Sequence, residues 1–385
     1  MRRIDGEWLS RPETTAVMSA LSGGGYNVHF VGGCVRDALV EHPVKDVDIA
    51  TDARPEAVIA LSEAAGHKTV STGIQHGTVT VVSGGYPYEV TTFRRDVTTD
   101  GRRAVVAFSD DIAEDAARRD FTINALYADA DGRVRDPLGS GVVDLQDGRV
   151  RFVGDAETRI REDYLRILRF FRFFARFGTS GPDTEALAAI GLCLDGLHTL
   201  SSERVGQEMM RLLGDGDPGR SVAAMAAVGV LGQVLPGADP TGLPVVVHLE
   251  TEAGVAPDRI RRLAVLGGDQ PDVLWRLSNA ETRRLELLRE SLGSGAGIAE
   301  IGYRHGAEAA IDVALLRAAV SGVPLPHTAI ADAKRGALAF FPVAAADLMP
   351  ELEGAVLGQR LRDLEDRWIR SDFSLSRDAL LNFDL

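Results

Sequence analysis

The 385-residue chain lacks several features that would assign it to a protein class at once. Its only two cysteines, Cys34 and Cys193, exclude a disulfide framework and favour a reducing cytoplasm. The start, MRRIDGEWLS, has no apolar core of signal-peptide length. The most apolar stretch, SVAAMAAVGVLGQVLPG, is shorter than the roughly 18 residues of a membrane span and is interrupted by Gln233. We therefore expect a cytoplasmic protein with no membrane partner.

The chain also lacks the basic excess that is common in nucleic-acid-binding proteins, because its formal net charge is −14. A local basic surface can still bind a polyanion, so the total charge neither supports nor excludes nucleic acid. Hydrophobic residues make up 45% of the chain and charged residues 25%, which is typical of a folded protein. The length exceeds that of one ordinary core and predicts two or more domains.

The sequence pattern changes after about the first 150 residues. Short β-rich runs, NVHFV, DVDIA, GTVTVVS and YPYEVTTF, alternate at first with helical patterns and glycine turns. Later residues are rich in Leu, Ala, Glu and Arg, with breaks at the spacing of helix pairs. The fold class predicted is α+β, with a nucleotidyltransferase-like mixed β-sheet head at residues 1–150, a helical neck at 151–220, and a helical body and tail at 221–385.

Two further segments have distinct patterns. DAETRIREDYLRILRFFRFFARFG predicts one long helix that begins after Asp155 and ends at Gly178. TTDGRRAVVAFSDD, residues 98–111, has turn residues and little periodicity, which predicts a mobile loop.

The run KDVDIAT carries two aspartates, Asp46 and Asp48, with one residue between them. In a strand, such residues point the same way at a spacing of roughly 6.5–7 Å, and here Val47 and Ile49 would face the core. Clustered carboxylates suit hard divalent cations such as Mg²⁺, and Glu89 in YPYEVTTF is a candidate third acid. The alternative is an exposed edge strand with charges that prevent aggregation.

The motif VGGCVRD lies about a dozen residues before this strand run and reads as a strand, a glycine pair and a helix start. Gly32 and Gly33 would let backbone N–H groups approach a phosphate, and Arg36 would reach the same anion. The alternative is a plain strand-to-helix turn in which glycine relieves backbone strain. Together with the aspartate pair, the motif favours a phosphate site.

Several motifs then occur in an order that resembles one family. GGCVRD, DVDIAT, GIQHGTVTVV, YEVTTFR, RRDFTINALY and REDYLRILRFFRFFARFG resemble the class II, bacterial-type CCA-adding tRNA nucleotidyltransferases, which share a superfamily with bacterial poly(A) polymerases. LSSERVGQEMMRLL is similar to the family's next motif, a helix that braces the nucleotide-reading helix. The resemblance implies that Arg119, Asp120 and Asn124, in a predicted helix at 118–127, bind the incoming nucleotide. Asp120 capping the helix, with Asn124 bonding to backbone, is the structural alternative.

Asp163 and Arg166 are three residues apart, which predicts that they are neighbours on one helix face. A carboxylate accepts from an exocyclic amine and a guanidinium donates to a ring nitrogen, so this pair would accept cytosine and adenine and reject uracil and guanine. The alternative is a surface ion pair worth at most ~1 kcal/mol. The resemblance implies that Arg169 and Arg172 face the triphosphate, while Arg176 would be solvated. The phenylalanines of this helix are predicted to be mostly core.

The resemblance implies template-independent addition of C, C and A to the 3′ end of tRNA from CTP and ATP, with release of pyrophosphate. Asp46 and Asp48 would hold Mg²⁺, and Glu89 would be a third ligand or the base for the hydroxyl proton. The helical remainder would bind tRNA by shape, and no protein partner is implied. The alternatives are a poly(A) polymerase, a partial CC- or A-adding enzyme, and an inactive RNA-binding protein on the same fold. The complete segment 98–111 favours A addition, and the intact carboxylates argue against an inactive protein.

Overall fold

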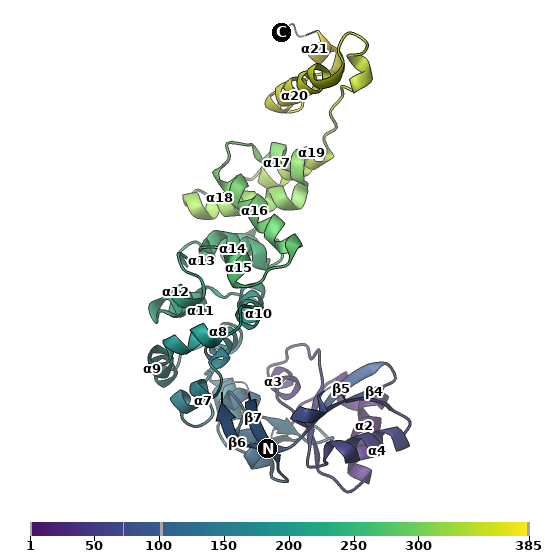
Figure 1. Cartoon of the computed structure of the whole chain (residues 1–385), viewed down its shortest axis with the longest axis vertical. Coiled ribbons are helices and arrows are strands. Elements are labelled where there is room, and N and C mark those ends of the chain that lie inside the picture. The colour runs from purple at the N-terminus through teal and green to yellow at the C-terminus, as the bar shows by residue number, and fades with distance from the viewer. Residues whose placement is uncertain (1, 72, 101–102, 383–385) are drawn as a thin grey trace. The chain divides into compact units, whose positions relative to one another are not determined.

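The computed structural model divides the chain into two compact units (Figure 1). The structure describes residues 2–71, 73–100 and 103–382. The first unit is Met1–Gly237 with Val273–Arg276, and the second is Ala238–Asp272 with Leu277–Leu385. The predicted head and neck therefore belong to one unit, and the finer boundaries after residues 150 and 220 remain predictions.

A seven-stranded mixed sheet forms the centre of the head, in the order β3-β4-β5-β2-β1-β8-β9. Its strands are β1 (Val28–Val31), β2 (Asp48–Thr51), β3 (Lys68–Val70), β4 (Thr78–Ser83), β5 (Tyr86–Thr92), β8 (Tyr127–Ala128) and β9 (Val134–Arg135). Strands β2 and β5 are parallel, and the other neighbours are antiparallel. The predicted mixed sheet is confirmed.

Short helices surround this sheet. They are α1 (Glu7–Ser10), α2 (Pro12–Gly23), α3 (Gly33–Leu39), α4 (Pro55–Ala64), α5 (Ile112–Ala117) and α6 (Gly141–Gln146), with 3₁₀ turns η1 (Ile74–His76) and η2 (Thr122–Asn124). Helices α2 and α4 both begin at a proline, which suits the first helical turn because its N–H groups have no intrahelical partner. They pack on each other and on β4, where Val17 and Val58 are buried. These two helices form one layer against the sheet (Figure 1).

The segment 98–111 was expected to be a mobile loop, and this interpretation is wrong for most of its length. Strands β6 (Arg94–Asp100) and β7 (Arg103–Phe108) pair antiparallel as a separate two-stranded sheet. Residues 101 and 102 of the segment lie outside the described residues. The strands form because β6 and β7 pair with each other, and the local sequence pattern does not show this pairing.

The helix expected over 118–127 is also absent from the described fold. Helix α5 ends at Ala117, and the chain continues through a turn, an isolated bridge between Phe121 and Phe152, and η2 into β8. The Thr122 N–H donates to the Arg151 carbonyl at 3.0 Å, and the Val153 N–H donates to the Asp120 carbonyl at 3.0 Å. These tertiary hydrogen bonds replace the helical ones around Phe121.

The long helix predicted from Asp155 to Gly178 is two helices, α7 (Ala156–Glu162) and α8 (Leu165–Phe177). The Asp155 carboxylate accepts from the Thr158 N–H at 2.8 Å, so the predicted N-cap is confirmed, as is the end at Gly178. The break lies at Asp163, whose backbone is extended at φ −156° and ψ 104°. Its carboxylate accepts from the Leu165 N–H at 3.1 Å, which satisfies a free donor at the start of α8.

The remaining helices of the first unit are α9 (Thr184–Leu192), η3 (Leu194–Thr199), α10 (Ser202–Gly214), α11 (Gly219–Ala227) and α12 (Val230–Val234). Among them, α10 and α11 pack on α8, α9 packs on α7, and α12 packs on α11 and η3. The phenylalanines of α8 are buried, as predicted: Phe170, Phe171, Phe173, Phe174 and Phe177. Their side chains stabilise the unit by removing large aromatic surfaces from water.

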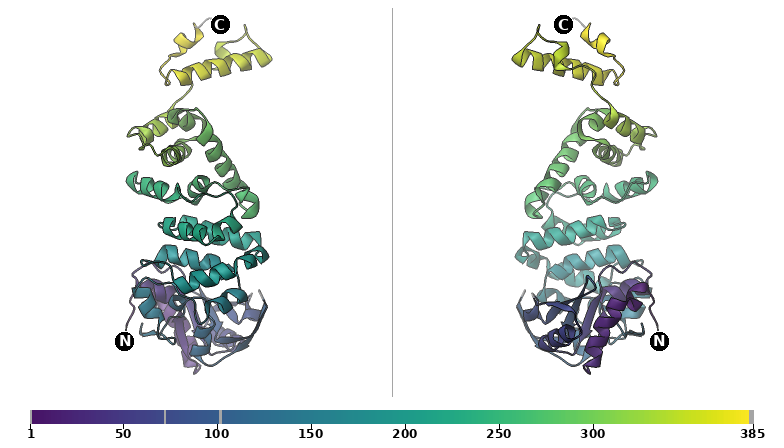
Figure 2. Two further views of the ribbon diagram at one scale, coloured as in Figure 1. Left: turned by 90° about the vertical axis from the view of Figure 1, so that its left-hand side faces the viewer. Right: turned by 90° about the vertical axis from the view of Figure 1, so that its right-hand side faces the viewer.

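Within its described residues, the second unit consists of helices joined by loops, with an isolated β-bridge between Ala238 and Gly267 (Figure 2). Its helices are α13 (Leu243–Glu252), α14 (Arg259–Leu266), α15 (Pro271–Leu274), α16 (Asn279–Gly293), α17 (Ile298–His305), α18 (Ala307–Ser321), α19 (Ala329–Leu338), η4 (Ala345–Asp347), α20 (Gly354–Arg370) and α21 (Arg377–Leu381), of which α15 extends partly into the first unit. Helices α17 and α19 pack so closely at Gly336 that a Cβ there would lie 1.8 Å from the Ala299 carbonyl oxygen. Across the described part of the chain, no helix combines the length and apolarity that crossing a membrane requires.

Candidate active site

The three predicted carboxylates come from two adjacent parallel strands. Asp48, the first residue of β2, pairs in register with Glu89 of β5, and Asp46 lies two residues before Asp48. Val47 and Ile49 are buried, while Asp46 and Glu89 are exposed and Asp48 is half-buried. The alternation predicted for KDVDIAT is therefore confirmed, although the strand begins only at Asp48. Adjacent strands lie about 4.8 Å apart, so the Asp48 and Glu89 side chains start from neighbouring positions.

The environment of Asp48 disfavours the charged form of its carboxyl group. Burial, together with the negative charges of Glu89 and Asp46, raises the pKa of Asp48 to about 6, although Arg119 opposes the rise. A divalent cation between carboxylates would relieve this repulsion, so Asp46 and Asp48 fit the role of metal ligands. No cluster of three or more His, Cys, Asp or Glu side chains able to hold a metal occurs within the described residues. The remaining ligands of such an ion would be water or substrate phosphates.

The predicted glycine turn lies between β1 and α3. Gly32 has a positive φ of 70°, which favours glycine, and Gly33 is the first residue of α3. Behind the turn, the Cys34 thiol donates to the Asp48 carbonyl with a sulfur–oxygen distance of 3.7 Å. This contact links the start of α3 to the strand that carries the aspartates.

Arg36 has a different environment from the one expected. Its side chain was predicted to reach an anion, but it is buried and only 7% exposed. Its Nε and Nη2 atoms donate to Asp37 at 2.9 and 2.7 Å, and Nη1 donates to the Asn124 side chain. The guanidinium also lies 4.3 Å from the centre of the Phe177 ring. Arg36 thus connects α3, η2 and α8, and its contact with a phosphate remains a prediction.

Asp120 links the head to α8. Its carboxylate accepts from the Asn124 side-chain amide at 2.9 Å and from Arg169 Nε at 2.8 Å. Burial alone would raise the pKa of Asp120, but Arg169 and the hydrogen bonds from Asn124 and the Phe121 N–H outweigh it and lower the pKa to about 2. The predicted residues Asn124, Asp120 and Arg169 therefore form one connected polar group.

Asp163 and Arg166 are not neighbours on one helix face, because Asp163 lies in the break between α7 and α8, before α8 begins. Asp163 pairs with Arg204 of α10 at 2.7 Å. Arg166 pairs with Glu162 and donates to the Arg159 carbonyl. The predicted helical neighbourhood is therefore wrong, and base reading by Asp163 and Arg166 stays a prediction.

Helix α10 contributes two residues that the sequence interpretation did not name, Arg204 and Glu208. Glu208 is only 4% exposed, and its carboxylate lies 2.6 Å from Arg172 Nε and 3.9 Å from Arg169 Nη1. The predicted bracing of α8 by this helix agrees with these ion pairs. The spacing of four residues between Arg204 and Glu208 places both on one helix face and could have identified them.

Arg176 was expected to be solvated, and the residue is exposed as predicted, but its side chain also makes protein contacts. Its guanidinium lies 3.3 Å from the Asp37 carboxylate and packs over the Phe177 ring at 5.3 Å. Arg176 therefore forms a second connection between α8 and α3, next to that of Arg36.

Comparison with known proteins gives matches along most of the chain. Residues 28–151 match the family described as the poly A polymerase head domain, and residues 182–241 match a probable RNA and SrmB-binding site of polymerase A. A CCA-adding enzyme of Leuconostoc citreum is 47% identical over 201 residues, covering 51% of this chain and 48% of that protein. The mitochondrial CCA tRNA nucleotidyltransferase 1 of Danio rerio is 32% identical over 388 residues, covering 93% of this chain and 86% of that protein.

A solved structure is similar over nearly the whole length. The crystal structure of the Bacillus stearothermophilus CCA-adding enzyme in complex with CTP superimposes with a TM-score of 0.74 at 30% identity, covering 94% of this chain and 93% of that one. The matched region spans about half of the Leuconostoc protein but most of the Danio protein and of the solved structure.

Proposed function

The chain belongs to the family of CCA-adding enzymes, tRNA nucleotidyltransferases that share a head domain with poly(A) polymerases, and we propose that it adds C, C and A to the 3′ end of tRNA from CTP and ATP. The observation that carries the proposal is the register pairing of Asp48 with Glu89 beside the Gly32 turn. Membership of this family implies dependence on a divalent metal ion in general. Relatives named as CCA-adding enzymes favour this reaction over the poly(A) polymerase alternative.

In the proposed reaction, the tRNA 3′-hydroxyl forms a bond to the α-phosphorus of the nucleotide, and the bond from that phosphorus to the pyrophosphate oxygen breaks. Asp46 and Asp48 would hold Mg²⁺, which when bound supplies positive charge to the hydroxyl and the phosphate oxygens. Glu89 is exposed beside Asp48, in a position to accept the hydroxyl proton or to complete the ligands of the ion.

The nucleotide would lie between the head and α8. The glycine turn at Gly32 and Gly33, with Arg119, would bind the triphosphate, since backbone N–H groups and a guanidinium both donate to phosphate oxygens. Asp120 and Asn124 already share a hydrogen bond and would contact the ribose hydroxyls. Arg36 is a weaker candidate because its donors bind Asp37 and Asn124.

Base choice is assigned to Asp163 and Arg166. A carboxylate acceptor beside a guanidinium donor matches the amino group and bare ring nitrogen of cytosine and adenine. Uracil and guanine would leave these groups unpaired or opposed. Arg169 and Arg172 would add positive charge near the triphosphate, although both also pair with acidic residues of the protein.

The helical residues from 221 onward would bind the tRNA, and a cytoplasmic location is part of the same proposal. Proteins read folded RNA largely through shape and backbone contacts, which a helical surface can provide. The reaction needs weak and repeated RNA binding, which is compatible with the net charge of −14.

Primer-extension assays test the proposal directly. tRNA transcripts that end before CCA, after C or after CC are incubated with Mg²⁺ and each labelled nucleotide. We expect CTP and ATP to be incorporated until CCA is complete. Long A tails would identify a poly(A) polymerase, and extension that stops at CC would identify a partial enzyme. No incorporation at all would contradict the proposal.

Asp46→Ala should abolish transfer, because one of the two predicted metal ligands is lost. The matched control is Asp110→Ala, which removes an exposed carboxylate that pairs with Arg54 at 3.3 Å in the same head. Equal activity of both variants would contradict the assignment of Asp46.

A further inference from the structure

We propose that Asp115 and Tyr127 are positioning residues that hold the Arg119 guanidinium where it binds the triphosphate of the incoming nucleotide. The inference rests on the proposed function and adds two residues to which the sequence analysis assigned no role, Tyr127 at the end of the RRDFTINALY motif and Asp115 just before that motif. Both side chains are buried, with Asp115 1% exposed and Tyr127 0% exposed. Their polar groups therefore have only protein partners to satisfy them.

One carboxylate oxygen of Asp115 contacts both Arg119 and Tyr127. Asp115 Oδ2 accepts from Arg119 Nη2 at 3.0 Å and from the Tyr127 hydroxyl at 2.6 Å. The Tyr127 oxygen in turn accepts from Arg119 Nε at 3.1 Å. The guanidinium is therefore held at two of its nitrogens, which restricts both its position and its plane.

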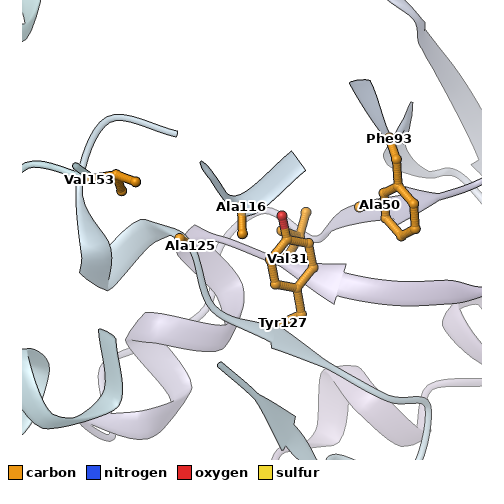
Figure 3. Close-up of a cluster of buried hydrophobic side chains, with 7 residues drawn as sticks. All are labelled: Val31, Ala50, Phe93, Ala116, Ala125, Tyr127 and Val153. Atoms are coloured by element: carbon orange, nitrogen blue, oxygen red, sulfur yellow. The ribbon is translucent and has the colours of Figure 1, made fainter. Parts of the chain in front are cut away.

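Tyr127 is fixed by the core of the head. Its ring packs in a cluster with Val31, Ala50, Phe93, Ala116, Ala125 and Val153, and its hydroxyl lies at the end of the ring toward Ala116 (Figure 3). Tyr127 also pairs in register with Val31 of β1, directly before the glycine turn. The position of the hydroxyl is thus set by the same strand pair that sets the turn.

The held guanidinium lies beside both halves of the proposed site. A Cβ at Gly32 would lie 3.3 Å from Arg119 Nη1, so Arg119 reaches the turn that would bind phosphate. The charge of Arg119 also acts on the carboxylate of Asp48. Arg119 is therefore the cation shared by the glycine turn and the aspartate strand.

Arg119 keeps N–H donors for a ligand after its hydrogen bonds to the protein are made. Arginine carries five N–H donors. Within the described residues, Nη2 donates to Asp115 and Nη1 donates to the Asn124 carbonyl at 3.4 Å, which leaves a second hydrogen on each nitrogen. An arginine already fixed in this way loses less conformational freedom when an anion binds, so the bound state forms at a smaller entropic cost.

The test measures anion binding separately from transfer. Equilibrium binding of inorganic tripolyphosphate and of CTP, in EDTA, is compared among the wild-type chain, Asp115→Asn and Tyr127→Phe. We expect the dissociation constants for both ligands to rise by roughly tenfold in Asp115→Asn and by a smaller factor in Tyr127→Phe, because a charged contact is lost in the first. In transfer assays, KM for CTP should rise while kcat changes little.

A double-mutant cycle separates positioning from a general structural role. In an Arg119→Ala background, Asp115→Asn should cause no further loss of tripolyphosphate binding, because the residue it positions is gone. Asp129→Asn is the matched control, since Asp129 follows β8 and pairs with Arg135 at 2.8 Å. It should bind tripolyphosphate like the wild-type chain.

Two outcomes would overturn the proposal. One is wild-type tripolyphosphate binding by folded Asp115→Asn or, if that variant does not fold, by folded Tyr127→Phe. The other is a loss in Asp115→Asn that persists in full without Arg119. Neither readout requires tRNA extension, so failure of the transfer assay in the wild-type chain would contradict the proposed function and leave this inference to be judged by binding alone.

Discussion

The Arg204 guanidinium lies 2.7 Å from the Asp163 carboxylate and joins α10 to the residue at which the helical neck breaks. The same Asp163 side chain accepts from the Leu165 N–H at the start of α8. Asp163 is therefore fixed by one local contact and one long-range contact. The direction in which the Asp163 carboxylate points depends on both contacts.

Removing the long-range contact should impair base selection. In Arg204→Ala we expect the preference for CTP and ATP over UTP and GTP to fall by roughly tenfold, the effect of losing one charged hydrogen bond that orients Asp163. Asp163→Ala should change selection in the same direction. Competition assays with pairs of labelled nucleotides measure the effect. The control is Arg161→Ala, which removes an exposed arginine paired with Glu157 in α7; similar selectivity in the two arginine variants would be inconsistent with the role of Arg204.

Asp120 should contribute an acid-sensitive part of the stability. Its pKa is lowered to about 2, so the unfolded chain binds a proton at this group more readily than the folded chain. The stability that Asp120 contributes is therefore present above the ordinary Asp pKa of about 3.9 and is lost as the pH falls toward 2. The shift corresponds to roughly 2–3 kcal/mol of unfolding free energy at neutral pH. Urea unfolding of Asp120→Asn between pH 6 and 2 should show a smaller loss than the wild-type chain. Parallel pH profiles for the two proteins would refute this prediction.

The second unit contains buried ion pairs that should be sensitive to removal of one partner. Asp312 is 1% exposed and accepts from Arg261 at 2.9 Å and from Arg284 at 2.7 Å. Asp312→Ala removes one of two carboxylates that pair with Arg261, which keeps Glu250 at 2.7 Å, and should lower the unfolding free energy by about 1.5–3 kcal/mol, the effect of losing a buried charged hydrogen bond. Denaturant unfolding monitored in the second unit measures the loss.

The same helix provides the control for this change. Glu308 pairs with Arg284 at 3.0 Å, but its side chain is 82% exposed. Glu308→Ala should cost less than about 1 kcal/mol, because water screens an exposed pair. Equal losses in Asp312→Ala and Glu308→Ala would show that burial does not decide the contribution.

The close approach of α17 and α19 should not tolerate a side chain at Gly336. Gly336→Ala places a Cβ against the backbone of Ala299, so the helices must separate, and we expect a loss of about 1–3 kcal/mol. Gly358→Ala is the control, because its Cβ would meet only the Arg362 side chain at 3.7 Å in α20. That variant should be neutral or slightly more stable, since alanine favours helices by about 1 kcal/mol over glycine. Thermal unfolding distinguishes the two, and equal melting temperatures would argue against the packing explanation.

Much of the candidate site could be predicted because its signals are local. The alternation of Asp46, Val47, Asp48 and Ile49 is a property of neighbouring residues, and burial follows it in the structure. The cap at Asp155 also depends only on the next three residues. Glu89 could be named as a candidate third acid, but its pairing with Asp48 requires a long-range strand register that only the sheet provides.

Other features could not be predicted from local patterns. The segment after α5 does not continue as a helix because the N–H groups of Thr122 and Val153 form backbone hydrogen bonds between residues 120–122 and 151–153. Residues 94–100 and 103–108 form strands because each arm pairs with the other. Arg36 looked available for an anion, but Asn124 and Phe177, far away in sequence, occupy its guanidinium.

The sequence by itself determined the periodicity of the strands, the helical character after the head and the residue types available for chemistry, because each depends on neighbouring residues. Only the tertiary structure decided which charges meet. Asp163 pairs with Arg204 rather than Arg166, and Asp115 with Tyr127 holds Arg119. The physical reason is that an ion pair depends on distance and burial, and chain folding sets both.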